Sequence, residues 1–223
     1  MTTPRQKGLT NKTLQEQAQS FLPPNTLYIA LYVRSDPPLP NDYHWAYYLH
    51  VPSHHRGGGG TKHDTDNTSG GWIPHHDTTA GILKTNFLCT LVHIADIPDE
   101  RIGRVEEIMR ERDGDLNQIP GVTCRVWLMV ILGRLVEEGV VVLREGTRGR
   151  VEAVEEDCMG LGNGFAGEAV RNVQPRPVVR SRVCFGQVNP KMYSLPGSLN
   201  LSPTPCSSFR SLLPQIQLGH VRI

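Results

Sequence analysis

One cysteine and two histidines of this chain could together perform nucleophilic chemistry. Cys124 follows Pro120-Gly121 and stands at the predicted start of an apolar helix, with Thr123 as its cap. The unpaired N–H groups of a first helical turn favour a thiolate over a thiol. His44 could then exchange a proton with the sulfur while His63 orients the imidazole ring. With main-chain N–H groups at the helix start as oxyanion donors, this set predicts acyl transfer or hydrolysis through a thioester.

Each of these residues also has a purely structural interpretation. A cysteine in an apolar helix is usually a small buried hydrophobe. His44 could be an ordinary strand histidine, and a surface position beside a glycine-rich segment explains His63 equally well. A non-catalytic accessory or interaction protein therefore stands beside the enzyme as the second hypothesis.

Clustered histidines raise a third hypothesis, a histidine-rich metal-binding protein. Seven of the nine histidines lie within residues 44–77, at positions 44, 50, 54, 55, 63, 75 and 76. Imidazole and nearby carboxylates suit zinc and other divalent ions. The chain contains neither HExxH nor paired cysteines, and the cluster lies in a glycine-rich segment, so we expect no metal site and no cofactor.

Five strands and two helices are predicted to position these residues. The strands are expected at residues 26–33, 43–51, 61–66, 72–73 and 87–94, where β-branched and aromatic residues or short polar runs are bounded by turn residues. A first helix, at about 99–112, carries an apolar stripe formed by Ile102, Val105, Ile108 and Met109. The second helix, Val122–Glu138, is apolar nearly all round and is predicted to lie at the buried centre of the fold.

The order of these motifs resembles circularly permuted papain-like thiol enzymes, the lecithin:retinol acyltransferase-like group. Tyr43-His44-Trp45-Ala46 is similar to their catalytic H-W strand, and Thr123-Cys124-Arg125 occupies the position of their nucleophile, where that group has Asn before the Cys. Their second polar residue, often His, lies on the next strand, where this chain has Lys62-His63-Asp64. The resemblance implies an α/β (α+β) domain, with a small antiparallel sheet packed on the Cys-bearing helix, and an acyl or other small-molecule substrate.

A closer resemblance is to a group of small fungal proteins that form a family of unknown function. They share an LY-rich first strand, a YHWA strand, a G-T-x-x-H strand, a long apolar strand and helix, and a C-x-x-W helix. This chain is similar to them from about Thr26 to Gly139. That resemblance brings no activity with it.

Composition divides the 223 residues into a polar leader (1–24), a single domain (25–145) and a basic tail (146–223). The 55 residues from 169 to 223 hold seven basic side chains, seven of the 17 prolines and no acidic side chain. We therefore expect the tail to be disordered and able to contact an acidic surface. The GxGxxG run at Gly162–Gly167 precedes a proline instead of following a strand, and is interpreted as a flexible turn.

Charge and cysteine usage exclude several classes. The net charge of +1 is not that of a general nucleic-acid binder. The longest apolar run, Val126–Leu132, is far shorter than the ~20 residues of a membrane span, and no apolar signal segment occurs near the N-terminus. The five cysteines form no CxxC pair, so reduced thiols and a cytoplasmic location are expected.

Overall fold

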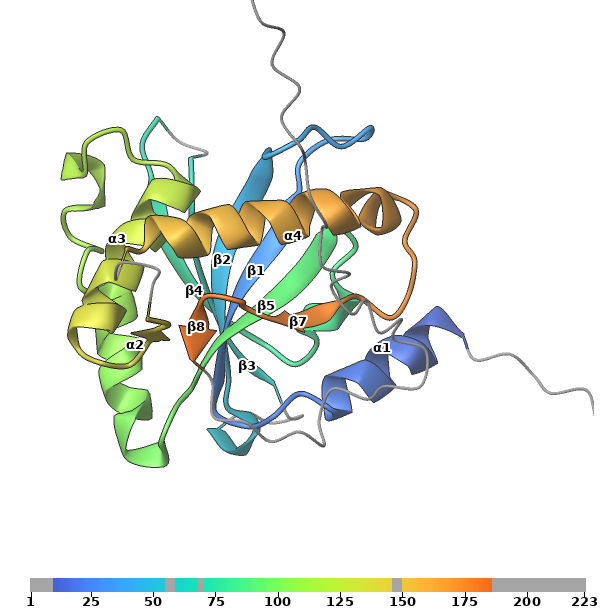
Figure 1. Cartoon of the computed structure of the whole chain (residues 1–223), viewed down its shortest axis with the longest axis horizontal. Helices are drawn as coiled ribbons and strands as arrows, with labels where there is room; N and C mark the ends of the chain where they lie inside the picture. The colour runs from blue at the N-terminus through green and yellow to red at the C-terminus, as the bar shows by residue number, and fades with distance from the viewer. Residues whose placement is uncertain (1–9, 55–58, 68–69, 146–149, 186–223) are drawn as a thin grey trace, which may run out of the picture. The chain divides into compact units, whose positions relative to one another are not determined.

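A six-stranded sheet forms the framework of the protein (Figure 1). The computed structural model describes residues 10–54, 59–67, 70–145 and 150–185. In this part of the chain the strand order is β4-β3-β2-β1-β5-β7, and all neighbours are antiparallel except β5 and β7. The strands are β1 (Thr26–Val33), β2 (Tyr43–His50), β3 (Gly60–Asp66), β4 (Ile73–Thr79), β5 (Leu88–Asp96) and β7 (Val178–Arg180). The short strands β6 (Val142–Leu143) and β8 (Cys184–Phe185) pair separately.

Both faces of the central strand β1 are buried, which explains its continuous apolar sequence TLYIALYV. Leu27, Ile29 and Leu31 point into the main core. Tyr28 and Tyr32 alternate with them and point into a smaller core on the opposite face. The protein is therefore a mixed α/β structure with a layer of side chains on each side of the sheet.

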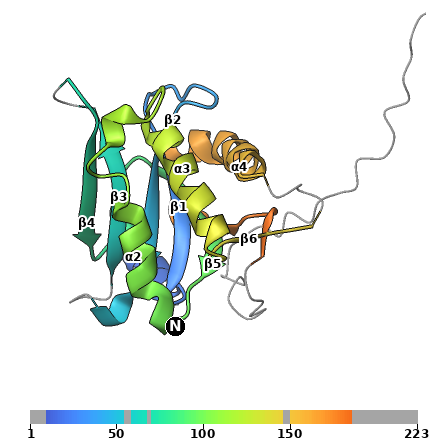
Figure 2. The ribbon, with the colours of Figure 1, turned by 90° about the vertical axis from the view of Figure 1, so that its left-hand side faces the viewer.

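Helices cover the two faces unequally. The helices α2 (Ile102–Arg110), α3 (Cys124–Glu137) and α4 (Glu152–Val170) pack on the main core, with α3 between α2 and α4 (Figure 2). The helix α1 (Asn11–Ser20) packs on the other face. All four residues of the stripe predicted for α2 are buried. The predicted apolar helix is confirmed as α3, and Gly139, at φ +66°, follows its end.

The strand predictions hold best where the sequence is apolar. The prediction for Thr26–Val33 matches β1 residue for residue, and the other long strands agree within two residues at each end. The fourth strand is longer than the predicted Trp72-Ile73 and runs to Thr79. Its sequence IPHHDTT carries little β-propensity, and its ladder with β3 holds it at the edge of the sheet.

The chain continues the fold beyond residue 145, contrary to the predicted tail. Val154, Cys158, Ala166 and Ala169 of α4 are buried in the main core, and β7 extends the sheet. The predicted flexible turn at Gly162–Gly167 is wrong, because it lies inside α4. Four glycines in this helix hide its apolar periodicity, which explains the error. The rest of the predicted tail, residues 186–223, lies outside the described residues.

Within the predicted polar leader, residues 10–24 also contribute to the fold. The side chain of Thr10 accepts a hydrogen bond from the Thr13 N–H and caps α1. Ala18 and Leu22 are buried against the smaller core. The second half of the predicted leader is therefore part of the fold, and it contains the helix α1.

Gly162 allows α4 to approach the sheet closely, and we expect its replacement to destabilise the protein. A Cβ atom at this position would lie 2.9 Å from two ring carbons of Tyr43. Overpacking costs ~1–3 kcal/mol, which outweighs the ~1 kcal/mol that alanine gains over glycine in a helix. Gly162→Ala should therefore lower the free energy of unfolding in urea. Gly164→Ala is the matched control, because a Cβ atom at that position would meet no other atom within 4 Å, and it should raise stability. Equal stabilisation by both changes would contradict this account of the packing.

Candidate active site

Cys124 is the first residue of α3, where the sequence predicts it. The Thr123 hydroxyl accepts a hydrogen bond from the Val126 N–H at 3.1 Å, so the predicted cap is present. The sulfur of Cys124 accepts hydrogen bonds from the main-chain N–H groups of Trp45 and Arg125. Its exposed fraction is 6%. The thiol thus lies at the edge of the core, where main-chain donors surround it.

His44 joins the thiol to a carboxylate. It is the second residue of β2, and its Nε2–H donates to Asp64 Oδ2 at 2.8 Å. The same ring also forms a hydrogen bond with Cys124. Because Nε2 is hydrogen-bonded to Asp64, Nδ1 is the nitrogen that forms the hydrogen bond with the Cys124 sulfur. The His44 side chain keeps 31% of its surface exposed, so the site is open to solvent on this side.

An interrupted strand ladder makes room for this contact. β2 pairs with β3 over Tyr47–His50, and the ladder ends at the Tyr47–His63 pair. The first residues of β2 lie beyond that point and pair with β1, where His44 faces Tyr32. A ladder that continued would use the Trp45 N–H in pairing with β3. Instead this N–H donates to the Cys124 sulfur.

The charged forms of His44 and Cys124 stabilise one another. Burial alone would lower the pKa of His44, but hydrogen bonds to Asp64 and Cys124 outweigh it and raise this pKa to about 9. Burial would raise the pKa of Cys124, but the hydrogen bonds with His44 and the Trp45 N–H outweigh it and lower this pKa. The arrangement therefore favours the thiolate of Cys124 beside the imidazolium of His44 over the neutral thiol and imidazole.

Asp64 is kept ionised by two donors. Lys62 Nζ lies 2.9 Å from Oδ2, the carboxylate oxygen that also accepts from His44. Burial would raise the pKa of Asp64, yet the hydrogen bonds from His44 and Lys62 lower it. A carboxylate held in this state fixes the His44 tautomer and orients the ring.

His63 lies elsewhere, although the sequence predicts it in the orienting role. Its position opposite Tyr47 places it on the face covered by α2 and α3, whereas Asp64 shares the face of His44. Its Nδ1 lies 2.8 Å from the Nδ1 of His76. The structure thus brings Cys124 and His44 together and places Asp64 at the ring. In the sequence, Asp64 is indicated as an alternative only by its position next to His63. The register of the β2–β3 ladder decides which of these two side chains points toward His44.

The remaining described cysteines have no comparable surroundings. Cys89, Cys158 and Cys184 are buried, and burial raises the pKa of each, to about 12 for Cys89 and about 11 for Cys184. Cys206 lies outside the described residues. All four described cysteines are buried, so burial does not distinguish Cys124 from the others. Its hydrogen-bond partners do.

A family model described as a family of unknown function (DUF6914) matches residues 25–162, which is more than half of the chain. The chain belongs to the DUF6914 family. Cys124, His44 and Asp64 all lie within the DUF6914 match. No curated protein and no solved structure matches the chain.

Other regions of this DUF6914 protein offer less for chemistry. Among the described residues, no three His, Cys, Asp or Glu side chains could hold a metal ion; the side chains of His54 and His55 are outside this set. A cavity of about 180 Å³ lies at the opposite end of the sheet, beside Ile97, Val140 and Phe185. None of the described helices is long and apolar enough to cross a membrane.

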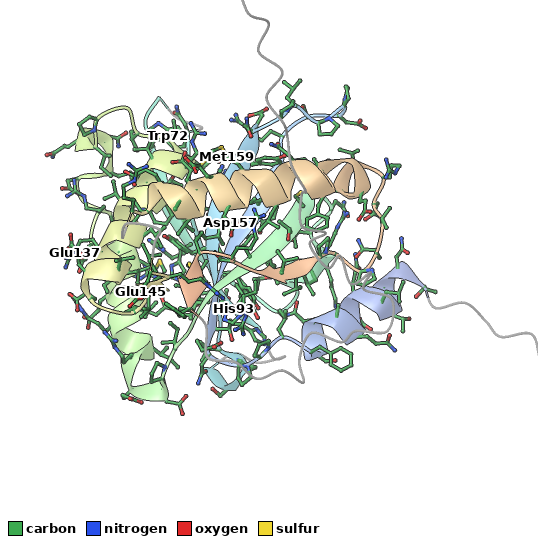
Figure 3. The ribbon with its side chains drawn as sticks, in the orientation of Figure 1. Trp72, His93, Glu137, Glu145, Asp157 and Met159 are labelled. Atoms are coloured by element: carbon green, nitrogen blue, oxygen red, sulfur yellow. The ribbon has the colours of Figure 1, made fainter. Side chains whose placement is uncertain are left out.

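Apolar side chains lie near the beginning of α3. Figure 3 labels Trp72, which precedes β4, and Met159 of α4, and the contact of Met159 with Arg125 places it at the beginning of α3. Both side chains are partly buried and pack against the main core. The Arg125 guanidinium approaches the Met159 sulfur at 3.8 Å and pairs with Glu155 at 3.3 Å. The beginning of α3 thus combines apolar contact surface with a paired cation.

Proposed function

We propose that this protein is a cysteine-dependent hydrolase or acyltransferase. The observation that carries this proposal is the hydrogen-bonded series Cys124–His44–Asp64, in which the thiol pKa is lowered and the imidazole pKa is raised. Matched nucleophile, base and orienting group are what covalent acyl chemistry requires. The order His, carboxylate, Cys along the chain also supports the resemblance to permuted papain-like thiol enzymes, and a reducing, cytoplasmic compartment would suit a free thiolate.

The reaction would proceed in two halves. The Cys124 thiolate attacks the acyl carbonyl, the S–C bond forms, and His44 donates its Nδ1 proton to the leaving group as the bond to that group breaks. Water or a second acceptor then gives a proton back to His44 and attacks the thioester, and the S–C bond breaks to restore the thiolate. The main-chain N–H of Cys124, the first residue of α3, would stabilise the oxyanion in both halves.

A simple acyl donor tests this proposal. The full chain is incubated with p-nitrophenyl acetate, p-nitrophenol is followed over time, and acetylated peptides are identified by mass spectrometry. We expect an initial burst of about one p-nitrophenol per chain and a hydroxylamine-sensitive acetyl group on Cys124, since acyl-enzymes accumulate in this way. Cys124→Ser should lose both signals, whereas Cys184→Ser should keep them. Equal acetylation of wild type and Cys124→Ser, or no acetylation of Cys124, would contradict the proposal. A non-catalytic interaction protein would then be the better interpretation.

A further inference from the structure

Asn163 connects α4 to the segment that leads into His44. It lies beside Gly162, where α4 approaches the sheet most closely. Its Oδ1 accepts hydrogen bonds from the Asn41 N–H at 2.9 Å and from the Tyr43 O–H at 2.8 Å. Its Nδ2–H donates to Asn41 Oδ1 at 2.8 Å. The orientation of the amide is fixed, because a main-chain N–H can only donate and must therefore meet the oxygen.

The segment that Asn163 holds needs such support. Asn41 has a φ of +61°, in the left-handed region that few residues other than glycine and asparagine adopt readily. The start of β2 pairs with β1 alone, since the β2–β3 ladder ends at Tyr47. The ion pair between Arg34 and Asp42 is largely exposed and contributes little. Hydrogen bonds from α4 therefore supply much of the restraint that the missing ladder would provide.

Tyr43 transmits this restraint to the next residue. It is 3% exposed and packs against Gly162, so its ring and its hydroxyl are both fixed by α4. Burial raises its pKa to about 12, so the hydroxyl stays a donor throughout the ordinary pH range. Adjacent side chains of a strand point to opposite faces, so a fixed Tyr43 also fixes the direction of His44.

We propose that Asn163 is a positioning residue, which holds the start of β2 so that the His44 ring meets Cys124 and Asp64 at the same time. It contacts neither the thiol nor the imidazole and acts through Asn41 and Tyr43. This inference rests on the proposed function, since it assigns a role in activating the same thiol. It also gives a purpose to the Gly162-Asn163-Gly164 segment, in which Gly162 permits the approach and Asn163 makes the bonds.

The pH dependence of Cys124 alkylation by iodoacetamide tests this role in the full chain. Asn163→Ala should reduce the rate at pH 6 by about threefold, less than removal of His44 itself, because small displacements of a catalytic group carry large costs in such sites. The midpoint of the rate against pH should move up toward the ordinary thiol value of ~8.5. Asn163→Asp should restore a profile close to that of wild type, because one carboxylate oxygen still accepts from the Asn41 N–H and the Tyr43 O–H, and the Asn41 amide can rotate so that its NH2 group donates to the other oxygen. Tyr43→Phe should fall between the two.

Ala166→Gly is the matched control, because it weakens the same helix without touching the β1–β2 connection. Circular dichroism confirms that each variant is folded at the temperature of the assay. An Asn163→Ala profile that keeps the wild-type midpoint, with stability lowered as in Ala166→Gly, would show that Asn163 is only structural. A wild-type Cys124 that ionises like a free thiol would overturn the proposed function as well, so the two failures are distinguishable.

Discussion

Cys124 is expected to react with iodoacetamide at pH 6 roughly tenfold faster than a free thiol, and His44→Ala is expected to remove this advantage. A free thiol with a pKa of ~8.5 is only about 0.3% ionised at pH 6. The imidazolium of His44 and the Trp45 N–H lower the pKa of Cys124, so a larger fraction of this thiol is thiolate at pH 6. The gain in rate is smaller than the gain in thiolate, because nucleophilicity falls with pKa.

The sign of the pH dependence follows from the two shifts. The low-pH limb reports the lowered pKa of Cys124, and the rate then stays level until His44 loses its proton near pH 9. Enzymatic turnover should instead fall through pH 9, since the leaving group then lacks its proton donor. Peptide mass spectrometry at each pH identifies the cysteine that reacts.

Asp64→Asn provides an intermediate result for the same measurement. The amide keeps the size of the carboxylate but loses its charge, so the pKa of His44 should fall and the thiolate should be less stable. Asp66→Asn is the matched control on the same strand, because Asp66 is exposed. If wild type, His44→Ala and Asp64→Asn share one profile centred near ~8.5, Cys124 is an ordinary thiol.

The protein is expected to lose stability as the pH falls below ~6.5, through a second group of titratable side chains. His76 Nε2–H donates to Asp113 at 3.0 Å, and His63 Nε2 lies 3.4 Å from Glu106. With the contact between the two Nδ1 atoms, the series Asp113–His76–His63–Glu106 fastens the β3–β4 hairpin to α2 and the segment after it. The His63 side chain is completely buried and that of His76 nearly so, and the two imidazoles therefore depend on their neighbours for hydrogen bonding.

The direction of the effect is set by His76. Burial lowers its pKa below the unfolded value, and its bond to Asp113 only partly offsets this. The unfolded chain therefore binds more protons as the pH falls, and stability decreases by up to ~1.4 kcal/mol per pH unit for each proton. Glu106 adds a loss at lower pH: burial opposes its ionisation, but its interactions with His63, Thr61 and Arg110 outweigh burial and lower its pKa.

Urea unfolding between pH 5 and pH 8 measures this dependence. His76→Gln should flatten it, because the amide can still form hydrogen bonds but does not titrate. The matched control is His75→Gln. His75 lies opposite Asp64 in the β3–β4 ladder, so its side chain is on the other face of the sheet from His76. His63→Leu should cost ~1–3 kcal/mol at pH 7, because it leaves the buried Nδ1 of His76 unpaired. An unchanged slope in His76→Gln would assign the acid sensitivity to other groups.

The sequence indicates the site to the extent that local signals define it. Thr123 predicts the start of α3, and the YHWA motif predicts the strand of His44, because caps and strand propensity act over a few residues. The choice between His63 and Asp64 depends on register, and a shift of one residue exchanges the two faces of a strand. No local pattern contains that information, so it had to come from the β2–β3 ladder.

The contribution of α4 could not be predicted for a similar reason. Its glycines weaken the helix propensity of the segment. The reason for a glycine at position 162 is the close contact with Tyr43, which only the folded structure shows. Asn163 likewise gains its partners from a segment 120 residues away. Packing between distant segments overrides local preference at these positions.

The separation of the site along the chain makes Cys124 a reporter of folding. His44 and Asp64 are 20 residues apart on neighbouring strands, and the sulfur comes from a helix that must dock on both. An unfolded chain cannot hold these groups together, so its thiol returns to ordinary acidity. Rapid labelling of Cys124 in mild acid would therefore mark native molecules, the reverse of the usual experiment, in which a buried thiol becomes reactive when the protein opens.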